Sequence, residues 1–398
     1  MKLERTSTPR MALATLTARP VVRYVLLVFV VIFALHSILS FTHSGYSDAT
    51  SLSHILGSSQ ARPTVPSEYY EDILPEYLNV SNHNNGHLLT RKANATMLML
   101  ARNSDIDGAV RSVREVEDRF NRKFGYPWVF LNEDEFSEEF KKRISVLTTA
   151  PVSFGKVPRE HWFQPAWIDE EKATAGRKKM EEEGVIYGGS LSYRNMCRFN
   201  SGFFYHHELL QQYRYYWRVE PDVHFHCEID FDPFLFMGDH NKTYGFTITM
   251  YEFDKTIPTL WDTVKAFVAE NPQYLSPENA MGYLSEDGGE RYNLCHFWSN
   301  FEIADMDFWR GEAYTKFFEY LDKTGGFYYE RWGDAPVHSI AAALFSRKDQ
   351  IHFFSEIGYE HNPYTHCPRG EAWTRGRCSC NEQKSFGECL ESDSGGQA

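Results

Sequence analysis

The run Ala95-Thr-Met-Leu-Met-Leu-Ala101 and the segment that follows it decide the fold of this chain. The run is short and apolar, as is typical of a buried strand. After Asp105, apolar residues recur every three or four positions from Ile106 to Phe124, which predicts an amphipathic helix. Gly125-Tyr-Pro ends that helix, and Trp128-Val-Phe-Leu131 is a second apolar run. A strand, a helix and a strand in this order predict a βαβ unit and therefore a parallel sheet.

The same alternation continues toward the C-terminus. We expect helices at 135–146, 193–212, 259–270, 307–321 and 336–345, and strands at 215–219, 244–251 and 297–303. The polar, charged stretch 169–184 is expected to be an exposed insertion or helix. With 42% hydrophobic residues, the chain can bury the core of one large domain or two small ones. We predict one α/β domain with an irregular, disulfide-linked tail.

The N-terminal segment predicts a membrane anchor. Apolar residues extend from about position 21 to 41, and a helix of about 20 residues crosses a bilayer. Five basic residues lie at or before Arg23, near the start of this segment, and none follows until Arg62, so the positive-inside rule places the N-terminus in the cytosol. We therefore expect a cytosolic tail at 1–23, a transmembrane helix at 24–41, a stem at 42–93 and a luminal domain at 94–398. A cleaved signal peptide is the alternative, against which the long basic leader argues.

Charge and cysteine content narrow the class of protein. A formal net charge of −13 argues against a general nucleic-acid binder, which needs a basic surface. A lumen permits disulfides, and we expect them in the C-terminal cluster of Cys367, Cys378, Cys380 and Cys389. Zinc is the rival ligand, but Cys-x-Cys with wide gaps is a poor zinc pattern. Seven cysteines leave at least one unpaired, which we expect among Cys197, Cys227 and Cys295.

The run Tyr215-Tyr-Trp-Arg-Val-Glu-Pro-Asp-Val223 carries the first candidate site. It reads as a buried strand that stops at Pro221, because proline cannot donate to a sheet ladder. Glu220 and Asp222 are then presented at the carboxyl end of the strand, where open α/β sheets bind ligands. Carboxylates at such a point suit Mg²⁺ or Mn²⁺ bridging a diphosphate. Taken alone, such a motif is more often a turn with two solvated acids.

Four further segments carry candidate residues, and each has an ordinary alternative. Glu302 ends an aromatic strand, where a surface or paired carboxylate is common. Asp334 precedes a helix and, by itself, would be read as its N-cap. His361 lies in a turn, where histidine is usually solvated. The segment 188–198 is a glycine loop that leads into a helix with basic residues, which is a candidate anion site.

Together these segments resemble the fungal type II membrane α-1,2-mannosyltransferases of glycosyltransferase family 15. The strings Tyr292-Asn-Leu-Cys-His-Phe-Trp-Ser-Asn-Phe-Glu-Ile303 and Glu330-Arg-Trp-Gly-Asp-Ala-Pro-Val-His338 are the most specific, and the resemblance covers about 95–367. It implies a GT-A-like, Rossmann-related α/β transferase domain with a mixed, mostly parallel sheet. It also implies an enzyme of the Golgi lumen that moves mannose from GDP-mannose to a mannosyl glycan acceptor, with Mn²⁺ as cofactor.

The resemblance also assigns residues. It implies that Glu220 and His361 hold Mn²⁺ together with the phosphates of the donor, and that Glu302 lies near the reacting carbon of the sugar. Contacts with donor or acceptor are expected from Tyr193, Arg198, Asp334 and Asp222. For Asp222 the alternative is that it shapes the loop without touching the metal.

These residue types fit the chemistry. GDP is a poor leaving group unless its charge is neutralised, as a divalent ion does. Mannose is α-linked in the donor and in the product, so configuration is retained. Glu302 is either a nucleophile in a double displacement, as in retaining glycosidases, or a carboxylate that stabilises positive charge or orients the acceptor during same-face attack. Acceptors could be O-linked chains, N-glycan outer chains or glycolipid headgroups, as in the synthesis of cell-wall mannoproteins. The rival functions are a catalytically silent glycan-binding or scaffold protein, and the same fold with a different donor or linkage.

Overall fold

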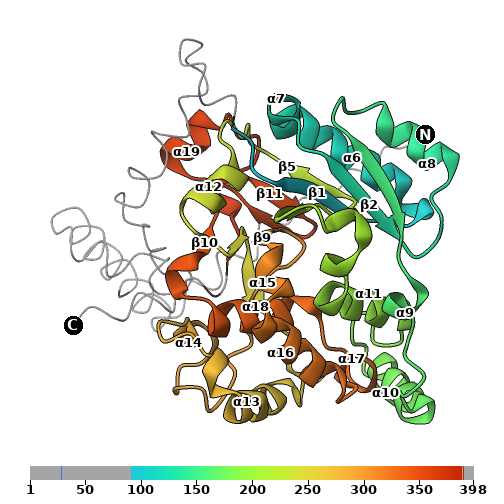
Figure 1. The fold of residues 1–398 in the computed structure, drawn as a ribbon. Coiled ribbons are helices and arrows are strands. Elements are labelled where there is room, and N and C mark those ends of the chain that lie inside the picture. Colours follow the sequence, from blue (N-terminus) through green and yellow to red (C-terminus); the bar gives the residue numbers. More distant parts are fainter. Residues whose placement is uncertain (1–27, 29–90, 388, 390–398) are drawn as a thin grey trace, which may run out of the picture. The chain divides into compact units, whose positions relative to one another are not determined.

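The computed structural model describes residues 28, 91–387 and 389 (Figure 1). Contacts divide the chain into Met1–Pro66 and Ser67–Ala398, and the helices and strands described below lie in the second unit. The predicted cytosolic tail, transmembrane helix and stem lie almost wholly outside the described residues, so they stay predictions. Among the residues that are described, no helix is both long and apolar enough to cross a bilayer.

Within the described residues, seven strands form the main sheet in the order β10-β6-β9-β4-β1-β2-β3. Their bounds are β1 Ala95–Leu100, β2 Trp128–Asn132, β3 Val152–Lys156, β4 Tyr215–Arg218, β6 Tyr244–Phe246, β9 Glu302–Asp305 and β10 Ile351–Phe353. Strand β9 runs antiparallel to both neighbours, and the other pairs are parallel. The expectation of a mixed, mostly parallel sheet is therefore confirmed.

The predicted βαβ unit is present. Between β1 and β2 lie α6 (Ile106–Val116), a π-helical turn (Glu117–Asn121) and α7 (Arg122–Phe124). Gly125 ends α7 with a φ of 66°, a conformation that glycine adopts without strain.

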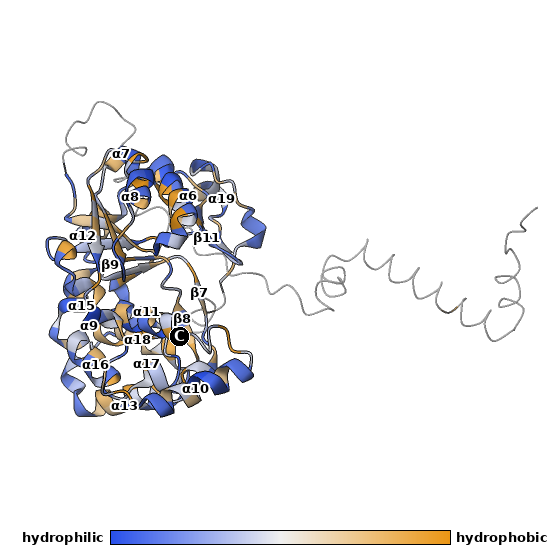
Figure 2. Ribbon diagram, turned by 90° about the vertical axis from the view of Figure 1, so that its right-hand side faces the viewer, coloured by the Kyte–Doolittle hydropathy of each residue, from blue (hydrophilic) through white to orange (hydrophobic). Residues whose placement is uncertain are grey.

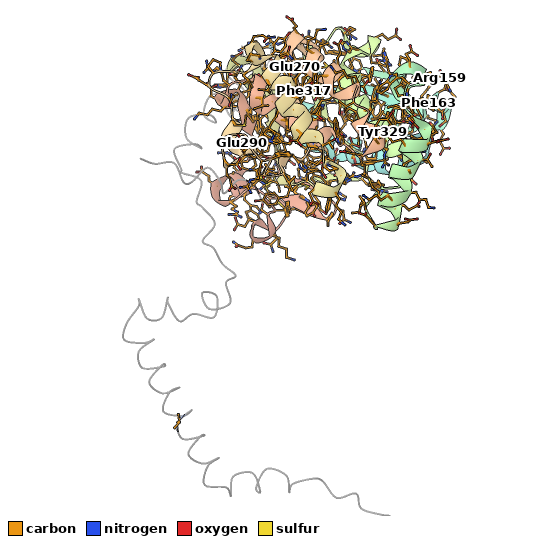
Figure 3. The ribbon with its side chains drawn as sticks, turned by 90° about the horizontal axis from the view of Figure 1, so that it is seen from below. Arg159, Phe163, Glu270, Glu290, Phe317 and Tyr329 are labelled. Atoms are coloured by element: carbon orange, nitrogen blue, oxygen red, sulfur yellow. A yellow bond between two sulfur atoms is a disulfide. The ribbon has the colours of Figure 1, made fainter. Side chains whose placement is uncertain are left out.

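Side chains of β1 alternate between two hydrophobic cores, one on each face of the sheet. Met97 and Met99 pack into one core, whereas Leu98 packs into the other. The first core lies under α6, α8 (Glu138–Ser145) and α12 (Pro233–Asp239). The second lies under α11 (Leu191–Gly202), α13 (Leu260–Glu270), α16 (Glu312–Asp322) and α18 (Asp334–Phe345). Figure 2 shows hydrophobic colour on the central strands. Figure 3 labels Glu270 of α13 and Phe317 of α16, two helices that pack together through the rings of Phe267 and Phe317, whose centroids are 5.4 Å apart.

Two smaller sheets complete the described fold. β5 (Val223–Phe225), β11 (Tyr359–His361) and β12 (Tyr364–His366) form one, in the order β12-β11-β5. β7 (Thr249–Tyr251) pairs with β8 (Cys295–Phe297) in the other. The predicted single strands at 244–251 and 297–303 are therefore wrong: each is two strands in two different sheets. Glu302 consequently begins β9 instead of ending a strand.

Several predicted helices are confirmed with different ends. The stretch 169–184 contains α10 (Glu170–Glu182), an exposed helix with Ala173 and Met180 buried. The helix predicted at 193–212 stops at Gly202, where a Cβ would overlap the ring of Phe318, and two 3-10 turns follow. The helix predicted at 307–321 is divided at Gly311 into α15 (Met306–Arg310) and α16.

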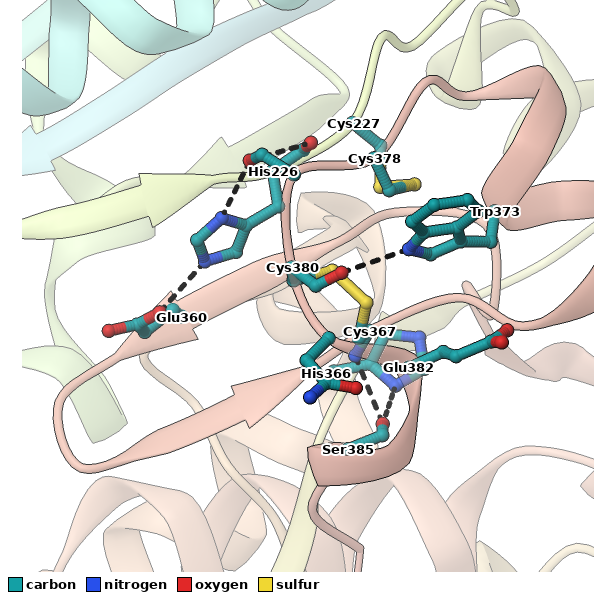
Figure 4. The surroundings of a disulfide bond; sticks show 12 residues. His226, Cys227, Glu360, His366, Cys367, Trp373, Cys378, Cys380, Glu382 and Ser385 are labelled. Carbon is teal, nitrogen blue, oxygen red and sulfur yellow. Dashed lines mark hydrogen bonds and ion pairs between the residues drawn. A yellow bond between two sulfur atoms is a disulfide. The ribbon is translucent and has the colours of Figure 1, made fainter.

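The described part of the chain contains three disulfides, Cys227–Cys378, Cys295–Cys389 and Cys367–Cys380, while Cys197 is free and buried. The prediction of disulfides in the C-terminal cluster is confirmed, and the unpaired cysteine is one of the three expected. Two of the four tail cysteines bond to the body of the domain, so the tail is fastened across it. Figure 4 shows the first and third bridges beside Trp373, whose Nε1 donates to the carbonyl of Cys380.

Candidate active site

The turn between β4 and β5 carries the Glu-Pro-Asp motif. β4 ends at Arg218 and β5 begins at Val223, so the motif lies at the carboxyl end of a central strand, as predicted. β5 pairs with β11, and in that register Val223 is opposite His361. The small sheet therefore brings His361 next to the turn that presents Glu220.

Arg218 joins three of the predicted site residues. Its Nε donates to Oε1 of Glu220 at 2.6 Å. Its Nη1 donates to Oδ2 of Asp334 at 2.6 Å and to Oε1 of Glu302 at 3.3 Å. Arg218 and Glu302 face each other because β9 runs antiparallel to β4 with these two residues in register. We call Arg218, Glu220, Glu302 and Asp334 the Arg218 cluster.

Carboxyl groups outnumber the cation in the Arg218 cluster. Burial alone would lower the pKa of Arg218, but the carboxylates of Glu220, Asp334 and Glu302 outweigh it and raise that pKa well above its usual value. Burial would likewise raise the pKa of Asp334, yet Arg218 outweighs it and holds that pKa below its usual range. Arg218 therefore stays charged, and three acidic groups around one guanidinium favour the approach of a further cation.

Glu302 is buried, with 1% of its side chain exposed, and both of its oxygens have partners. Oε1 faces Arg218, while Oε2 lies 2.8 Å from Nδ1 of His338 and accepts from the hydroxyl of Tyr216 at 3.4 Å. Nε2 of His338 lies 3.0 Å from the carbonyl of Asn200, which can only accept, so Nε2 carries a hydrogen. A hydrogen bond between Nδ1 and Oε2 then requires a hydrogen on one of these two atoms.

His361 is held through Nδ1 and through one face of its ring. The side-chain amide of Asn300 hydrogen-bonds to Nδ1, and the ring of Trp298 stacks on the imidazole with centroids 5.4 Å apart. Burial lowers the pKa of His361, which favours the neutral imidazole that a metal requires. Nε2 is the ring nitrogen left to bind a ligand.

Asp222 points toward α6. It adopts a φ of 61°, and its carboxylate forms an ion pair with Arg111. A Cβ on Gly108 would lie 2.6 Å from the carboxylate of Asp222, so Gly108 makes room for it. This arrangement agrees with the alternative in which Asp222 shapes the loop.

Asp334 is the first residue of α18, and Gly333 is its N-cap. Reading Asp334 as the N-cap is therefore wrong. Its Oδ2 accepts from Ser299 at 2.8 Å as well as from Arg218, because a buried carboxylate needs such partners.

Of the two predicted residues on α11, the structure brings Tyr193 near Asp334 and directs Arg198 elsewhere. Tyr193 stacks on Tyr187, and Asp334 lies close enough to raise its pKa, although burial is the larger cause. Nε and Nη2 of Arg198 donate to Asp322 at 2.7 and 2.8 Å, which ties α11 to α16. Asp322 thus occupies two of the three guanidinium nitrogens, while Nη1 is buried with no hydrogen-bond partner among the described residues.

The sequence did not predict a role for Arg218 or His338, although both lie within the candidate segments 215–223 and 330–338. A signal for Arg218 was present, because a charged residue inside an otherwise aromatic, buried strand needs a buried partner. For His338, one helical turn after Asp334, spacing on the helix is the only hint.

Comparisons with known proteins identify the family of this chain. A family model described as glycolipid 2-alpha-mannosyltransferase matches residues 59–394. Glycolipid 2-alpha-mannosyltransferase 2 of Candida albicans is 57% identical over 296 residues, which cover 74% of this chain and 64% of that relative, slightly less than two thirds of its length. Alpha-1,2 mannosyltransferase KTR1 of Saccharomyces cerevisiae is 48% identical over 83% of this chain and 85% of its own.

Two solved structures share the fold. Core-mannan synthase A of Aspergillus fumigatus, in a Mn/GDP form, has a TM-score of 0.71 at 46% identity, covering 74% of this chain and 80% of its own. The mannosyltransferase Ktr4p of S. cerevisiae, in complex with GDP, has a TM-score of 0.72 at 45% identity, covering 74% and 78%.

Proposed function

Because this chain belongs to the glycolipid 2-alpha-mannosyltransferase family, glycosyltransferase family 15, we propose that it is a retaining α-1,2-mannosyltransferase. It moves mannose from GDP-mannose to a mannosyl glycan acceptor. The observation that carries the proposal is the meeting of Glu220, Glu302 and Asp334 around Arg218, with His361 beside them, at the ligand-binding edge of the sheet.

Glu220 and His361 are the residues that would hold Mn²⁺, the ion found with GDP in the Aspergillus relative. A carboxylate and a neutral imidazole suit this metal. Among the described residues, no group of three or more His, Cys, Asp or Glu side chains could hold a metal ion. Glu220 and His361 would therefore share the metal with oxygens of the donor diphosphate. The chemistry that the metal supplies when bound is neutralisation of the charge on the departing GDP.

Glu302 lies at the reacting carbon of the sugar in this proposal. Arg218 and His338 fix its two oxygens, so the carboxylate is held in one orientation. Such a group can act as the nucleophile of a double displacement or stabilise positive charge during same-face attack. Asp334 and Tyr193 contribute to substrate binding, Asp222 shapes the turn, and Arg198 supports α11 through Asp322.

The enzyme works in the Golgi lumen as a type II membrane protein. Support comes from the apolar segment at 21–41 with its basic N-terminal flank, and from three disulfides, which form in oxidising compartments. The relatives are fungal mannosyltransferases, and a location in the secretory pathway agrees with that activity.

The test is transfer by the purified protein from GDP-mannose to methyl α-mannoside, with Mn²⁺ or with chelator. Glu220→Ala and His361→Ala should each weaken metal-dependent binding of GDP-mannose, whereas Asp222→Gly, which the φ of 61° tolerates, should leave it intact. Glu302→Gln should lower turnover by about 100-fold or more and leave donor binding unchanged, because it removes charge needed only in the transition state.

Two outcomes would support the rival functions. Donor binding without transfer to any mannoside would indicate a catalytically silent glycan-binding or scaffold protein. Transfer that yields another linkage, or that uses another sugar donor, would keep the fold and change the specificity. Near-normal turnover in Glu302→Gln would disprove the role of Glu302 at the reacting carbon.

A further inference from the structure

Two loops meet beside Tyr193 and present exposed aromatic rings. One is the segment 183–190 between α10 and α11, and the other is the segment 252–256 after β7. Tyr187 is 59% exposed and Phe253 is 60% exposed. The loops are joined by an ion pair between Lys255 and Glu183 at 3.4 Å. We call Tyr187 and Phe253 the aromatic rim.

Glu252 and Arg331 lie below the rim. Only 10% of the Glu252 side chain and 5% of the Arg331 side chain are exposed, and their nearest charged atoms are 3.6 Å apart. Within the described residues, Glu252 makes its contacts through Oε1. This oxygen faces Arg331 and accepts hydrogen bonds from the backbone amide of Phe253 and the hydroxyl of Thr256. Nε of Arg331 is buried with no hydrogen-bond partner among these residues. Oε2 of Glu252 is thus left for a donor from outside.

Glu252 is also close to the Arg218 cluster. Oε2 lies 3.5 Å from the position that a Cβ on Gly333 would take. Gly333 precedes Asp334, whose carboxylate binds Arg218. The guanidinium of Arg331 lies over the ring of Tyr193, 5.2 Å from its centroid, and Tyr193 stacks on Tyr187 of the rim at 4.6 Å. A continuous set of side chains therefore leads from the reacting centre to the rim.

This combination suits an uncharged sugar ring. Aromatic side chains pack against apolar surfaces such as one face of a pyranose, while a carboxylate accepts hydrogen bonds from its hydroxyls. A diphosphate fits poorly, since Glu252 would repel it. The rim also comes from loops outside β1, β2 and β3, the parallel strands at whose carboxyl ends a nucleotide is expected.

We propose that Glu252 and the aromatic rim form an acceptor subsite, which binds the sugar unit next to the mannose that receives the transferred residue. The proposal rests on the proposed function. It makes the enzyme selective for the length of its acceptor, because a monosaccharide reaches the reacting centre without touching the rim and a disaccharide contacts both.

The experiment compares KM for methyl α-mannoside and for a methyl mannobioside at saturating GDP-mannose. The variants are Phe253→Ser, Tyr187→Ser and Glu252→Gln. Val146→Ser is the matched control, because Val146 is 73% exposed and follows α8, which packs on the other face of the sheet. Each rim or Glu252 variant should raise KM for the mannobioside about 10-fold, which corresponds to about 1.4 kcal/mol of binding free energy, and KM for the monosaccharide by less than about 2-fold. The control should change neither.

Binding of GDP is measured on the same proteins and should be unchanged. A weaker affinity for GDP in the Phe253→Ser or Tyr187→Ser protein would place the nucleotide at the rim and overturn the proposal. Equal changes in KM for both acceptors, or no change for either, would also overturn it. If the unchanged protein transfers mannose to neither acceptor, the proposed function itself fails, which is a distinguishable result.

Discussion

Arg218 organises the site at the scale of single residues. One buried guanidinium fixes the positions of Glu220, Glu302 and Asp334, which come from three separate parts of the chain. Buried ion pairs add little net stability, because desolvation offsets the attraction, but removing one partner leaves charges buried without compensation. The Arg218 cluster therefore serves to position the three carboxylates, and it adds little to the stability of the fold.

His338 should matter for turnover more than for donor binding. It holds Oε2 of Glu302 through a hydrogen bond, so His338→Asn loses that contact and frees the carboxylate to rotate. We expect turnover to fall by about 10- to 100-fold, in the range for misplaced catalytic groups, and stability to fall by about 1–3 kcal/mol because a buried group loses its partner. Single-turnover kinetics and binding of GDP-mannose measure the two effects separately.

Ser339→Ala is the control for His338→Asn. Ser339 is the next residue of α18, is equally buried, and bonds to the carbonyl of Ala335 and the amide of Phe297 instead of to Glu302. The Ser339→Ala protein should be less stable than the unchanged protein but should keep its turnover. Equal turnover losses in the two variants would mean that α18 acts only as a scaffold.

The sequence predicted the acidic residues and His361 as candidates, but not the contacts among them. The roles predicted for Glu302, Asp334 and His361 were implied by the resemblance to a family. The comparisons confirmed membership of that family. No sequence motif marks Arg218 as a site residue. Its contact with Glu302 depends on the register of β9 against β4, and residue periodicity contains no information about which strands pair.

At the scale of elements, the GT-A-like, mostly parallel sheet was predictable because the βαβ pattern is local. The division of 244–251 and of 297–303 was not. At 244–251 the chain passes from β6 of the large sheet to β7, and at 297–303 it passes from β8 back into β9 of the large sheet; no proline or charged residue marks either crossing. Alternation of side chains identifies a strand, but it does not say to which sheet the strand belongs.

The turn between β4 and β5 depends on the backbone of Asp222. A residue with φ of 61° is strained unless it is glycine, or asparagine or aspartate to a lesser degree, and a β-branched residue is least tolerated. Asp222→Gly should therefore change stability by less than about 1 kcal/mol, since the exposed pair with Arg111 contributes little. Asp222→Val should lose about 1–2 kcal/mol or more, because it loses the same pair and adds strain. Urea unfolding compares the two.

The same two proteins test the role of the Asp222 carboxylate. If Asp222 only shapes the turn, Asp222→Gly keeps Mn²⁺-dependent binding of GDP-mannose, and Asp222→Val weakens it by moving Glu220. Loss of metal-dependent binding in Asp222→Gly would show that the carboxylate itself contributes to the site.

At the scale of the whole molecule, the site exists only when distant segments are held together. His361 reaches Glu220 because β11 pairs with β5, and the tail that follows β12 is fastened to this sheet through Cys227. Disulfides were predictable from the cluster of cysteines and its expected compartment. Their pairing was not, because seven cysteines allow many combinations and only the fold decides which side chains meet.

Removing the disulfides should destabilise the protein in the order of the loops that they close. Cys227 and Cys378 are 151 residues apart, whereas Cys367 and Cys380 are 13 apart. In the chain-entropy model a bridge stabilises by restricting the unfolded chain, more so for a longer loop. The double variant Cys227→Ser/Cys378→Ser should therefore lose about 4–5 kcal/mol, and Cys367→Ser/Cys380→Ser about 3 kcal/mol.

Paired replacement avoids leaving a free thiol that could exchange with the remaining bridges. Urea unfolding of each double variant, with the other bridges intact, measures the loss of stability. The longer loop is itself shortened by Cys295–Cys389, so its advantage should grow when that bridge is removed from both proteins. Equal losses, or a larger loss for Cys367–Cys380, would mean that native contacts around Trp373 outweigh the entropy of the unfolded chain.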